Sequence, residues 1–178
     1  MIIIINGPLG IGKTQVSEKL VEFFDRAVML DGDYIGAVHP FEIYDDERIE
    51  YLYQTLRHLT AYHVEHGYRN FVLNYVFESA ASLARLCGLL ADLDGEIYAF
   101  RLTCTESEME RRIRSRAVGR PEEPDYLAWE LQRFRQLTAI QEAATQEGNL
   151  GEVIDTTQLS VPQVAQAIWD ALPSRRQD

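Results

Sequence analysis

The sequence predicts an α/β protein with a five-stranded parallel sheet and helices on both faces of that sheet. Short apolar runs typical of buried strands alternate along the chain with longer segments whose apolar residues recur at helical spacing. This alternation is typical of βαβ units, whose crossover connections are right-handed. In addition, the first apolar run, Ile2–Ile5, passes directly into a glycine-rich loop. Ligands of such sheets bind beyond the carboxyl ends of the strands, so the loop marks the expected functional edge.

The strands are expected where short runs are rich in β-branched, aromatic and other apolar residues. They cover residues 2–6, 27–30, 71–77, 97–102 and 153–154. The helices are expected near residue 13, over about residues 44–66, after Ser79, after Thr105, over about residues 125–147 and after Ser160. These three hydroxyl residues are typical N-caps, and Glu108 completes a capping-box spacing with Thr105.

Two further signals concern the boundaries of the long helix over residues 44–66. Gly67 is expected to end this helix as a C-cap residue. Residues 34–44, which include His39-Pro40, are predicted to be irregular.

The composition fits one domain over residues 1–173 and a short tail, residues 174–178, that we expect to be disordered. The formal net charge of −11 opposes association with nucleic acid or an anionic membrane. Cys87 and Cys104 stand in apolar contexts, as expected of free thiols in a reducing compartment. Because no run approaches the roughly twenty apolar residues of a membrane span, we expect a cytoplasmic protein.

The strongest motif is a phosphate-binding loop, in which Gly7, Gly12, Lys13 and Thr14 have the required spacing. The motif lies between an apolar strand and an amphipathic helix, a context that disfavours a glycine-rich turn without a ligand. Backbone N–H groups and the helix N-terminus would bind phosphate, with Lys13 on the β- and γ-phosphates and Thr14 on Mg²⁺. The expected nucleotide contacts are Gly7, Pro8, Leu9, Gly10, Ile11, Gly12, Lys13, Thr14 and Gln15.

Two carboxylates follow the second expected strand, in Asp31-Gly32-Asp33. Both side chains can face the γ-phosphate region, because residues two apart in an extended segment point to the same side. One would accept the proton of an attacking hydroxyl and the other would hold Mg²⁺. We expect Asp33 to be the base, since it lies farther beyond the strand, and Asp31 to serve the metal. The alternative is a polar turn that caps a helix.

The third expected strand lacks the Asp that often holds Mg²⁺ at this position of phosphate-loop proteins. Asn74 and Glu78 are the polar groups available there. Each has two interpretations. Asn74 either satisfies backbone groups or touches the acceptor, and Glu78 either opens a helix or touches the acceptor.

An arginine-rich segment is the second feature that suggests a phosphate ligand. Its members are Arg111, Arg112, Arg114, Arg116 and Arg120. Arg112 and Arg116 share a helix face and Arg120 lies beyond Gly119, which suits a lid that closes over ATP. The alternative, expected for Arg111 and Arg114, is surface pairing with the nearby glutamates at positions 106, 108, 110, 122 and 123.

Other side chains carry weaker signals. His58, His63 and His66 are expected to be surface or core residues, because the sequence places no further metal ligands beside them. Four aromatic residues either line an acceptor pocket or take part in ordinary packing: Tyr34, Phe41, Tyr44 and Tyr51.

With these motifs, the chain resembles the small-molecule kinase branch of P-loop proteins. Leu30–Asp33 is similar to the corresponding stretch of adenylyl-sulfate kinases, and Arg120-Pro121 to the lid of shikimate and gluconate kinases. Gly12–Gln15 resembles tunicamycin-resistance ATP-binding proteins and chloramphenicol phosphotransferases. The resemblance implies a three-layer P-loop NTPase fold with strand order 2-3-1-4-5 and an Arg-rich lid.

The resemblance also implies where the nucleotide lies. Adenine would be held between the lid base near Arg116 and the loop after the fifth strand, which includes Asp155 and Thr156. Arg112 and Arg116 would contact the nucleotide, and Arg120 would reach the phosphates.

We therefore expect an ATP-dependent phosphotransferase with Mg²⁺ that acts on a hydroxyl of a small metabolite or antibiotic. Its catalytic residues would be Lys13, Asp31, Asp33 and Arg120. The alternative is an ATP-binding resistance or regulatory protein that binds a ligand or partner without transfer. A GTPase is disfavoured, because the lysines at positions 13 and 19 leave none for a guanine site. The expected partner is a small molecule, with no nucleic acid or membrane, and the protein would be a monomer or homodimer.

Overall fold

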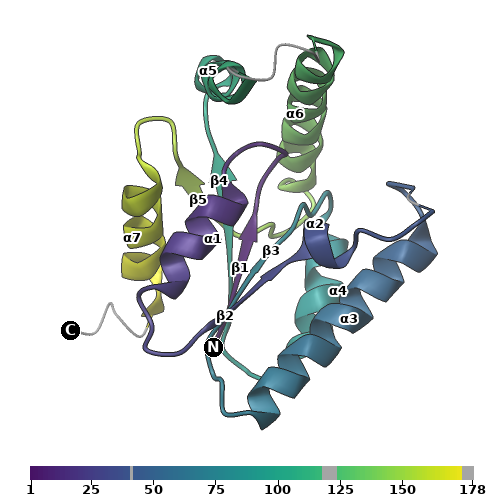
Figure 1. The fold of residues 1–178 in the computed structure, drawn as a ribbon, viewed down its shortest axis with the longest axis vertical. Helices are drawn as coiled ribbons and strands as arrows, with labels where there is room; N and C mark the ends of the chain where they lie inside the picture. The colour runs from purple at the N-terminus through teal and green to yellow at the C-terminus, as the bar shows by residue number, and fades with distance from the viewer. Residues whose placement is uncertain (41, 118–123, 174–178) are drawn as a thin grey trace.

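The computed structural model describes residues 1–40, 42–117 and 124–173. Its centre is a parallel sheet of five strands in the order β2-β3-β1-β4-β5 (Figure 1). The strands are β1 (Ile2–Asn6), β2 (Val28–Asp31), β3 (Phe71–Asn74), β4 (Ile97–Thr103) and β5 (Glu152–Asp155). The predicted fold class and strand order are confirmed.

Helices cover both faces of this sheet. They are α1 (Lys13–Val21), α2 (Gly32–Ile35), α3 (Asp46–Glu65), α4 (Ala80–Leu90), α5 (Glu106–Ala117), α6 (Pro124–Ala144) and α7 (Val161–Ala171). Helices α1 and α7 lie on one face and α3 and α4 on the other, while α5 and α6 stand beyond the end of the sheet where β1 leads into α1 (Figure 1).

The alternation of side chains along β1 explains the two cores. Ile3 and Ile5 pack into the core that includes α1 and α7, whereas Ile2 and Ile4 pack into the core that includes α3 and α4. All four side chains are fully buried, as expected for a central strand of a parallel sheet covered on both faces. This strand therefore fixes the position from which the glycine-rich loop leaves the sheet.

The helix ends confirm some of the predicted caps. Ser79 Oγ accepts a hydrogen bond from Ser82 N at 3.1 Å and caps α4. Gly67 has φ +84° and follows the last turn of α3, as a C-cap glycine does. At the start of α7, the Gln163 side chain accepts the Ser160 backbone N–H at 2.9 Å.

The capping box predicted at Thr105 is only half formed. Thr105 Oγ1 accepts the Glu108 N–H at 3.4 Å, but the Glu108 carboxylate bonds to Arg111 and Arg112 and not to Thr105 N. The bonds to the two guanidinium groups join opposite charges, whereas the bond that they replace would join the carboxylate to an uncharged N–H group. Thr105 N instead donates to Thr157 Oγ1 at 3.0 Å.

Two predicted boundaries were wrong. Residues 34 and 35 belong to α2, because Asp31 caps a short helix directly after β2. Strand β3 ends at Asn74 and not at Phe77, because β1, its neighbour, ends at Asn6. Beyond this point the Asn6 side chain, and not a backbone carbonyl of a neighbouring strand, accepts the Phe77 N–H at 2.9 Å.

Both cysteines, Cys87 and Cys104, carry free thiols, as predicted. Within the described ranges, no helix combines the length and the hydropathy that crossing a membrane requires.

Candidate active site

The phosphate-binding loop connects β1 to α1 and is anchored by a side chain that the motif does not include. Asn6 Oδ1 accepts hydrogen bonds from Gly7 N at 2.7 Å, Phe77 N at 2.9 Å and Gln141 Nε2 at 3.0 Å. Gln141 Nε2 also donates to Phe77 O at 2.9 Å. Asn6 and Gln141 are both fully buried, so this network ties the start of the loop to the segment after β3 and to α6.

Glycine is needed where the loop turns. Gly12, the N-cap of α1, has φ +104°, a conformation that side chains other than glycine rarely adopt. At Gly7, with φ +145°, a Cβ atom would lie 2.9 Å from Leu102 O. Both positions of the motif are therefore explained by the backbone itself.

Lys13 lies beneath this loop with 6% of its surface exposed. Its ammonium group donates to Gly7 O at 3.1 Å and Pro8 O at 3.2 Å. Desolvation lowers the pKa of Lys13, and the charges of Asp33 and Asp31 oppose that shift. Because the two bonded carbonyl oxygens are neutral, the positive charge of Lys13 is available to a phosphate in the loop.

The carboxylate of Asp31 performs two tasks. Its Oδ1 accepts the Asp33 N–H at 2.9 Å and caps α2, while its Oδ2 accepts a hydrogen bond from Thr14 Oγ1 at 2.8 Å. The helix-cap interpretation is therefore correct, and it does not displace the metal hypothesis. A hydroxyl and a carboxylate oxygen beside a phosphate loop form a donor set that suits Mg²⁺.

Asp33 lies at the start of α2 and faces a cavity beside the loop. Although the residue is exposed, desolvation by the surrounding protein raises the pKa of its carboxyl group above the ordinary value of 3.8. Lys13 lowers this pKa, Asp31 raises it and Arg48 lowers it, in decreasing order of effect. A carboxylate with a raised pKa accepts a proton more readily than an ordinary one.

Asn74 stands opposite Asp31 and Ile5 in the sheet register. Its side chain is 1% exposed, and neither its oxygen nor its nitrogen has a hydrogen-bond partner in the part of the chain that the structure describes. The interpretation that it satisfies backbone groups is therefore wrong. Asn74 shares a strand face with Val72, which packs in the α1 core, so its amide lies on the side of the sheet that carries Thr14.

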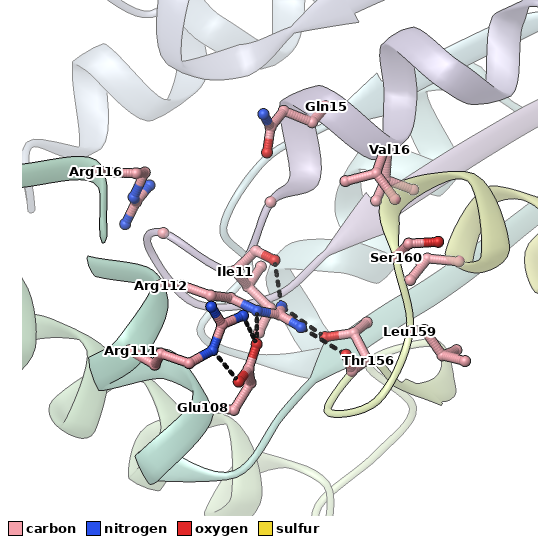
Figure 2. A pocket seen from close by; sticks show the side chains of 14 residues that line it. Ile11, Gln15, Val16, Glu108, Arg111, Arg112, Arg116, Thr156, Leu159 and Ser160 are labelled. Carbon is pink, nitrogen blue, oxygen red and sulfur yellow. Dashed lines mark hydrogen bonds and ion pairs between the residues drawn. The ribbon is translucent and has the colours of Figure 1, made fainter. Parts of the chain in front are cut away.

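A first cavity lies between the phosphate loop, α5 and the segment that leads into α7 (Figure 2). It has a volume of about 280 Å³. The predicted nucleotide contacts that line it are Gly10, Ile11, Gly12, Gln15, Arg112, Arg116 and Thr156. The sequence did not point to Val16, Leu159, Ser160, Val161 and Val164, which form its more apolar wall.

Arg112 lines this cavity, and its side chain extends from α5 toward Thr156 (Figure 2). It donates from Nη1 to Thr156 Oγ1 at 3.0 Å, from Nη2 to Thr156 O at 2.6 Å and from Nε to Glu108 Oε1 at 2.7 Å. Hydrogen bonds from Arg111 and then Arg112 lower the pKa of Glu108 to about 2. Asp155 does not line the cavity, because its carboxylate accepts the N–H and hydroxyl of Thr157.

Arg116 joins α5 to α6 above the loop. Its guanidinium donates to Glu130 Oε1 at 2.7 Å, and a Cβ at Gly10 would lie 2.8 Å from Arg116 Nη2. The other arginines follow the surface interpretation, since Arg111 pairs with Glu108 and Arg114 with Glu110. Arg120, Glu122 and Glu123 lie outside the described residues.

The second cavity, of about 370 Å³, lies on the other side of the loop. Its lining residues are Leu9, Asp33, Ile43, Arg48, Tyr75, Val76, Glu78, Trp129, Arg133 and Leu137. Asp33, the predicted base, and Glu78, a predicted acceptor contact, are among them, whereas Asn74 and Tyr44 are not. Tyr34 and Tyr51 are exposed and do not line the cavity, and Phe41 lies outside the described residues.

Glu78 forms an ion pair at the edge of this second cavity. Arg133 Nη2 donates to its Oε1 at 2.8 Å, and Tyr44 Oη donates to its Oε2 at 3.4 Å. Arg133 Nη1 also donates to Tyr44 Oη at 3.0 Å. Sequence reasoning missed Arg133, Trp129 and Arg48, because their helices approach Asp33 only in the folded chain.

The histidines play no part in either cavity. The rings of His58 and His66 contact carbonyl groups of their own helix, Gln54 O and Tyr62 O, both at 2.7 Å. Over the described ranges, His, Cys, Asp and Glu nowhere gather in a group of three or more that could hold a metal ion.

Comparisons with known proteins agree with this architecture. The chain is similar to the tunicamycin resistance protein of Deinococcus radiodurans, at 21% identity over 97% of this chain and 95% of that one, with a TM-score of 0.62. It is similar to shikimate kinase from Acinetobacter baumannii in complex with shikimate, at 22% identity over 99% and 95%, with a TM-score of 0.61. A gluconokinase from Sinorhizobium meliloti 1021 is 14% identical over 98% and 91%, with a TM-score of 0.58.

At these identities the likeness shows the fold, which is that of P-loop kinases, and this fold implies nucleotide binding. None of the curated proteins compared with the chain shows a significant match. Residues 2–138, well over half of the chain, match the model of the family described as AAA domain. The chain therefore belongs to the AAA domain family of P-loop proteins.

Proposed function

We propose that the protein is an ATP-dependent phosphotransferase that moves the γ-phosphate of ATP to a hydroxyl group of a small molecule. The observation that carries this proposal is the pair of cavities on either side of one phosphate loop. Gly10, Ile11 and Gly12 line the first cavity, and the preceding residue, Leu9, lines the second. A donor and an acceptor bound there would meet at the loop, as direct transfer between two substrates requires.

In this proposal the first cavity holds ATP. Lys13 and the N–H groups at the start of α1 bind its phosphates, and Arg112 orders the Thr156 segment that forms the opposite wall. Thr14 and Asp31 would hold Mg²⁺, which neutralises charge on the transferring phosphate when it is bound. The chain supplies this site with oxygen ligands that are already side by side.

Asp33 would act as the general base. Its carboxylate faces the second cavity, and its raised pKa favours acceptance of the proton that the acceptor hydroxyl loses. Lys13 is close enough to Asp33 to lower that pKa, and in this proposal Lys13 contacts the phosphates of ATP. These observations support a position for Asp33 where a hydroxyl and a phosphate would come together.

The acceptor would be a metabolite or an antibiotic. The name of the tunicamycin resistance protein, whose fold is similar, supports inclusion of antibiotics among the candidates. A cytoplasmic location, where ATP is available, belongs to the same proposal, as does action on a small molecule without nucleic acid or membrane. The net charge of −11 supports the latter.

A second candidate is an ATP-binding resistance or regulatory protein that transfers no phosphate. Its support is Asn74, which occupies the end of β3, where a carboxylate is common in P-loop enzymes, and which has no partner among the described residues. A neutral amide would bind Mg²⁺ or its water shell more weakly than a carboxylate. The two candidates differ in whether any acceptor gains a phosphate.

The test is a thermal-shift screen with Mg-ATP, Mg-GTP or no nucleotide, combined with panels of hydroxylated metabolites and antibiotics. Mass spectrometry then searches each stabilising mixture for a product heavier by one phosphoryl group. We expect a product with the native chain and none with Lys13→Ala. Stabilisation by Mg-ATP without any product would favour the second candidate.

A further inference from the structure

We infer that the second cavity selects an uncharged alcohol with an aromatic or otherwise apolar body, and excludes sugar acids and other carboxylate-bearing acceptors. This inference rests on the proposed function and narrows it to a substrate class. It is carried by the walls of the cavity and by the balance of charges within it.

The walls present more apolar than polar groups to a ligand. Leu9, Val76 and Leu137 supply aliphatic surface from the phosphate loop, the segment after β3 and α6. Two large apolar side chains at the mouth, Ile43 and Trp129, are 42% and 45% exposed. A ligand with an apolar body would bury this exposed surface, whereas a polyhydroxylated sugar would desolvate its own hydroxyl groups against it.

The charges in the cavity are already matched. The Arg133 guanidinium is held at 2.8 Å by the Glu78 carboxylate and at 3.0 Å by the Tyr44 hydroxyl. Arg48, which is 6% exposed and lines the same cavity as Asp33, donates to Glu42 O at 2.8 Å and to Ile43 O at 2.9 Å.

Among the described residues that line the cavity, two cations therefore face two carboxylates, one on Asp33 and one on Glu78. A carboxylate on the acceptor would add a third negative charge in a partly desolvated space, where an unmatched charge is costly. An uncharged alcohol adds none, and its hydroxyl can donate to Asp33.

A set of four small probes separates the two properties. 1-Phenyl-1,2-ethanediol and mandelate share an aromatic ring and a hydroxyl group, but only mandelate is charged. Glucitol and gluconate differ in charge in the same way and have no aromatic ring. Binding of each is measured by calorimetry without nucleotide, so that binding is separated from transfer. We expect the phenyl diol to bind more tightly than the other three probes.

Two variants test the two halves of the inference. Trp129→Ala should weaken binding of the phenyl diol about tenfold, because it removes an exposed apolar wall. Tyr62→Ala is the matched control, since Tyr62 is a 56% exposed aromatic residue of α3 that lines neither cavity. Glu78→Gln should increase mandelate affinity without improving that of the neutral diol, because it leaves the charge of Arg133 unmatched.

Tighter binding of mandelate or gluconate than of their neutral counterparts to the native chain would overturn the inference. So would an unchanged affinity of the phenyl diol in Trp129→Ala, or no binding by any of the four probes. Phosphate transfer to gluconate would support the proposed function and contradict this inference. Binding of the phenyl diol by a protein that phosphorylates no alcohol would support the inference about the cavity and contradict the proposed function.

Discussion

The hydroxyl of Thr14 donates a 2.8 Å hydrogen bond to the Oδ2 atom of Asp31. These residues come from the first turn of α1 and the end of β2, and together they place two oxygen atoms beside the phosphate loop. This contact leads to the first prediction, on metal-dependent nucleotide binding.

Thr14→Val should lower the affinity for Mg-ATP about 10- to 100-fold, because it removes one of the two oxygen ligands that we propose for Mg²⁺. Thr14→Ser keeps the hydroxyl and should bind Mg-ATP as the native chain does. Isothermal titration with Mg²⁺ and with EDTA measures the effect, which should disappear in EDTA. An equal loss of affinity in both conditions would mean that Thr14 contributes to packing and not to the metal site.

Lys13→Met should abolish ATP binding and at the same time stabilise the nucleotide-free protein. The Lys13 ammonium is desolvated, so its removal relieves an unfavourable burial. Because its folded pKa lies below 10.5, the unfolded chain binds more protons between the two values, and the native protein gains stability as pH rises through that window.

Urea unfolding of the native chain and of Lys13→Met across this pH range measures both effects. The pH-dependent gain should be absent from the variant. Lys19→Met is the control, since the Lys19 side chain is 38% exposed and paired with Glu22. A variant at position 13 that is less stable than the native chain at neutral pH would contradict the prediction.

Asn6→Ala should destabilise the protein by about 1–3 kcal/mol for each buried donor that it leaves unpaired. The Gly7 and Phe77 N–H groups both depend on the Asn6 oxygen. ATP affinity should fall as well, because the start of the phosphate loop loses its anchor. Asn149→Ala is the comparison. Asn149 is exposed and accepts a local bond from Gly151 N, so its replacement should cost far less stability. Equal losses in chemical denaturation would show that the Asn6 network is not special.

The pH dependence of transfer should reflect Asp33. A general base works in its ionised form, so kcat/KM should rise with pH through a pKa above the ordinary value of 3.8. The same raised pKa has a consequence for stability, because the folded state favours the protonated carboxyl. Asp33 therefore makes its stabilising contribution at low pH, and this is lost as pH rises through the folded pKa. Glu78→Gln, which leaves Asp33 in place, should keep the ascending limb. A rate that is independent of pH in this range would contradict the role of Asp33.

Much of the fold follows from local patterns. The apolar run Ile2–Ile5 predicts a strand buried on both faces, and the alternation of strands with helices predicts the parallel sheet. The two boundaries were wrong where a side chain forms the hydrogen bond. The Asp31 side chain caps α2 directly after β2, and beyond Asn74 the Asn6 side chain, in place of a strand partner, accepts a backbone N–H. Such contacts join residues far apart in sequence or depend on one rotamer, and periodicity does not encode them.

The candidate site was predictable to different depths. The phosphate loop and Asp33 could be predicted because short stretches of consecutive residues define them. The structure places Asp33 beside the loop. Arg133 and Trp129 lie nearly a hundred residues later, on α6. The sequence of this helix predicts which residues face the core, but not that these two lie near Asp33. The acceptor cavity therefore emerged only from the tertiary arrangement. The roles of Arg112, Arg116, Asp155 and Thr156 toward a nucleotide stay predictions.

The central claim is that Asp33 serves the acceptor while the phosphate loop serves ATP, and Asp33→Asn tests it most directly. Phosphate transfer to an acceptor found in the screen and the dissociation constant of Mg-ATP are measured on the same preparation. We predict a loss in kcat of at least about 100-fold, with little change in the affinity for Mg-ATP. Transfer at the native rate, or a loss explained entirely by weaker ATP binding, would contradict this division of labour.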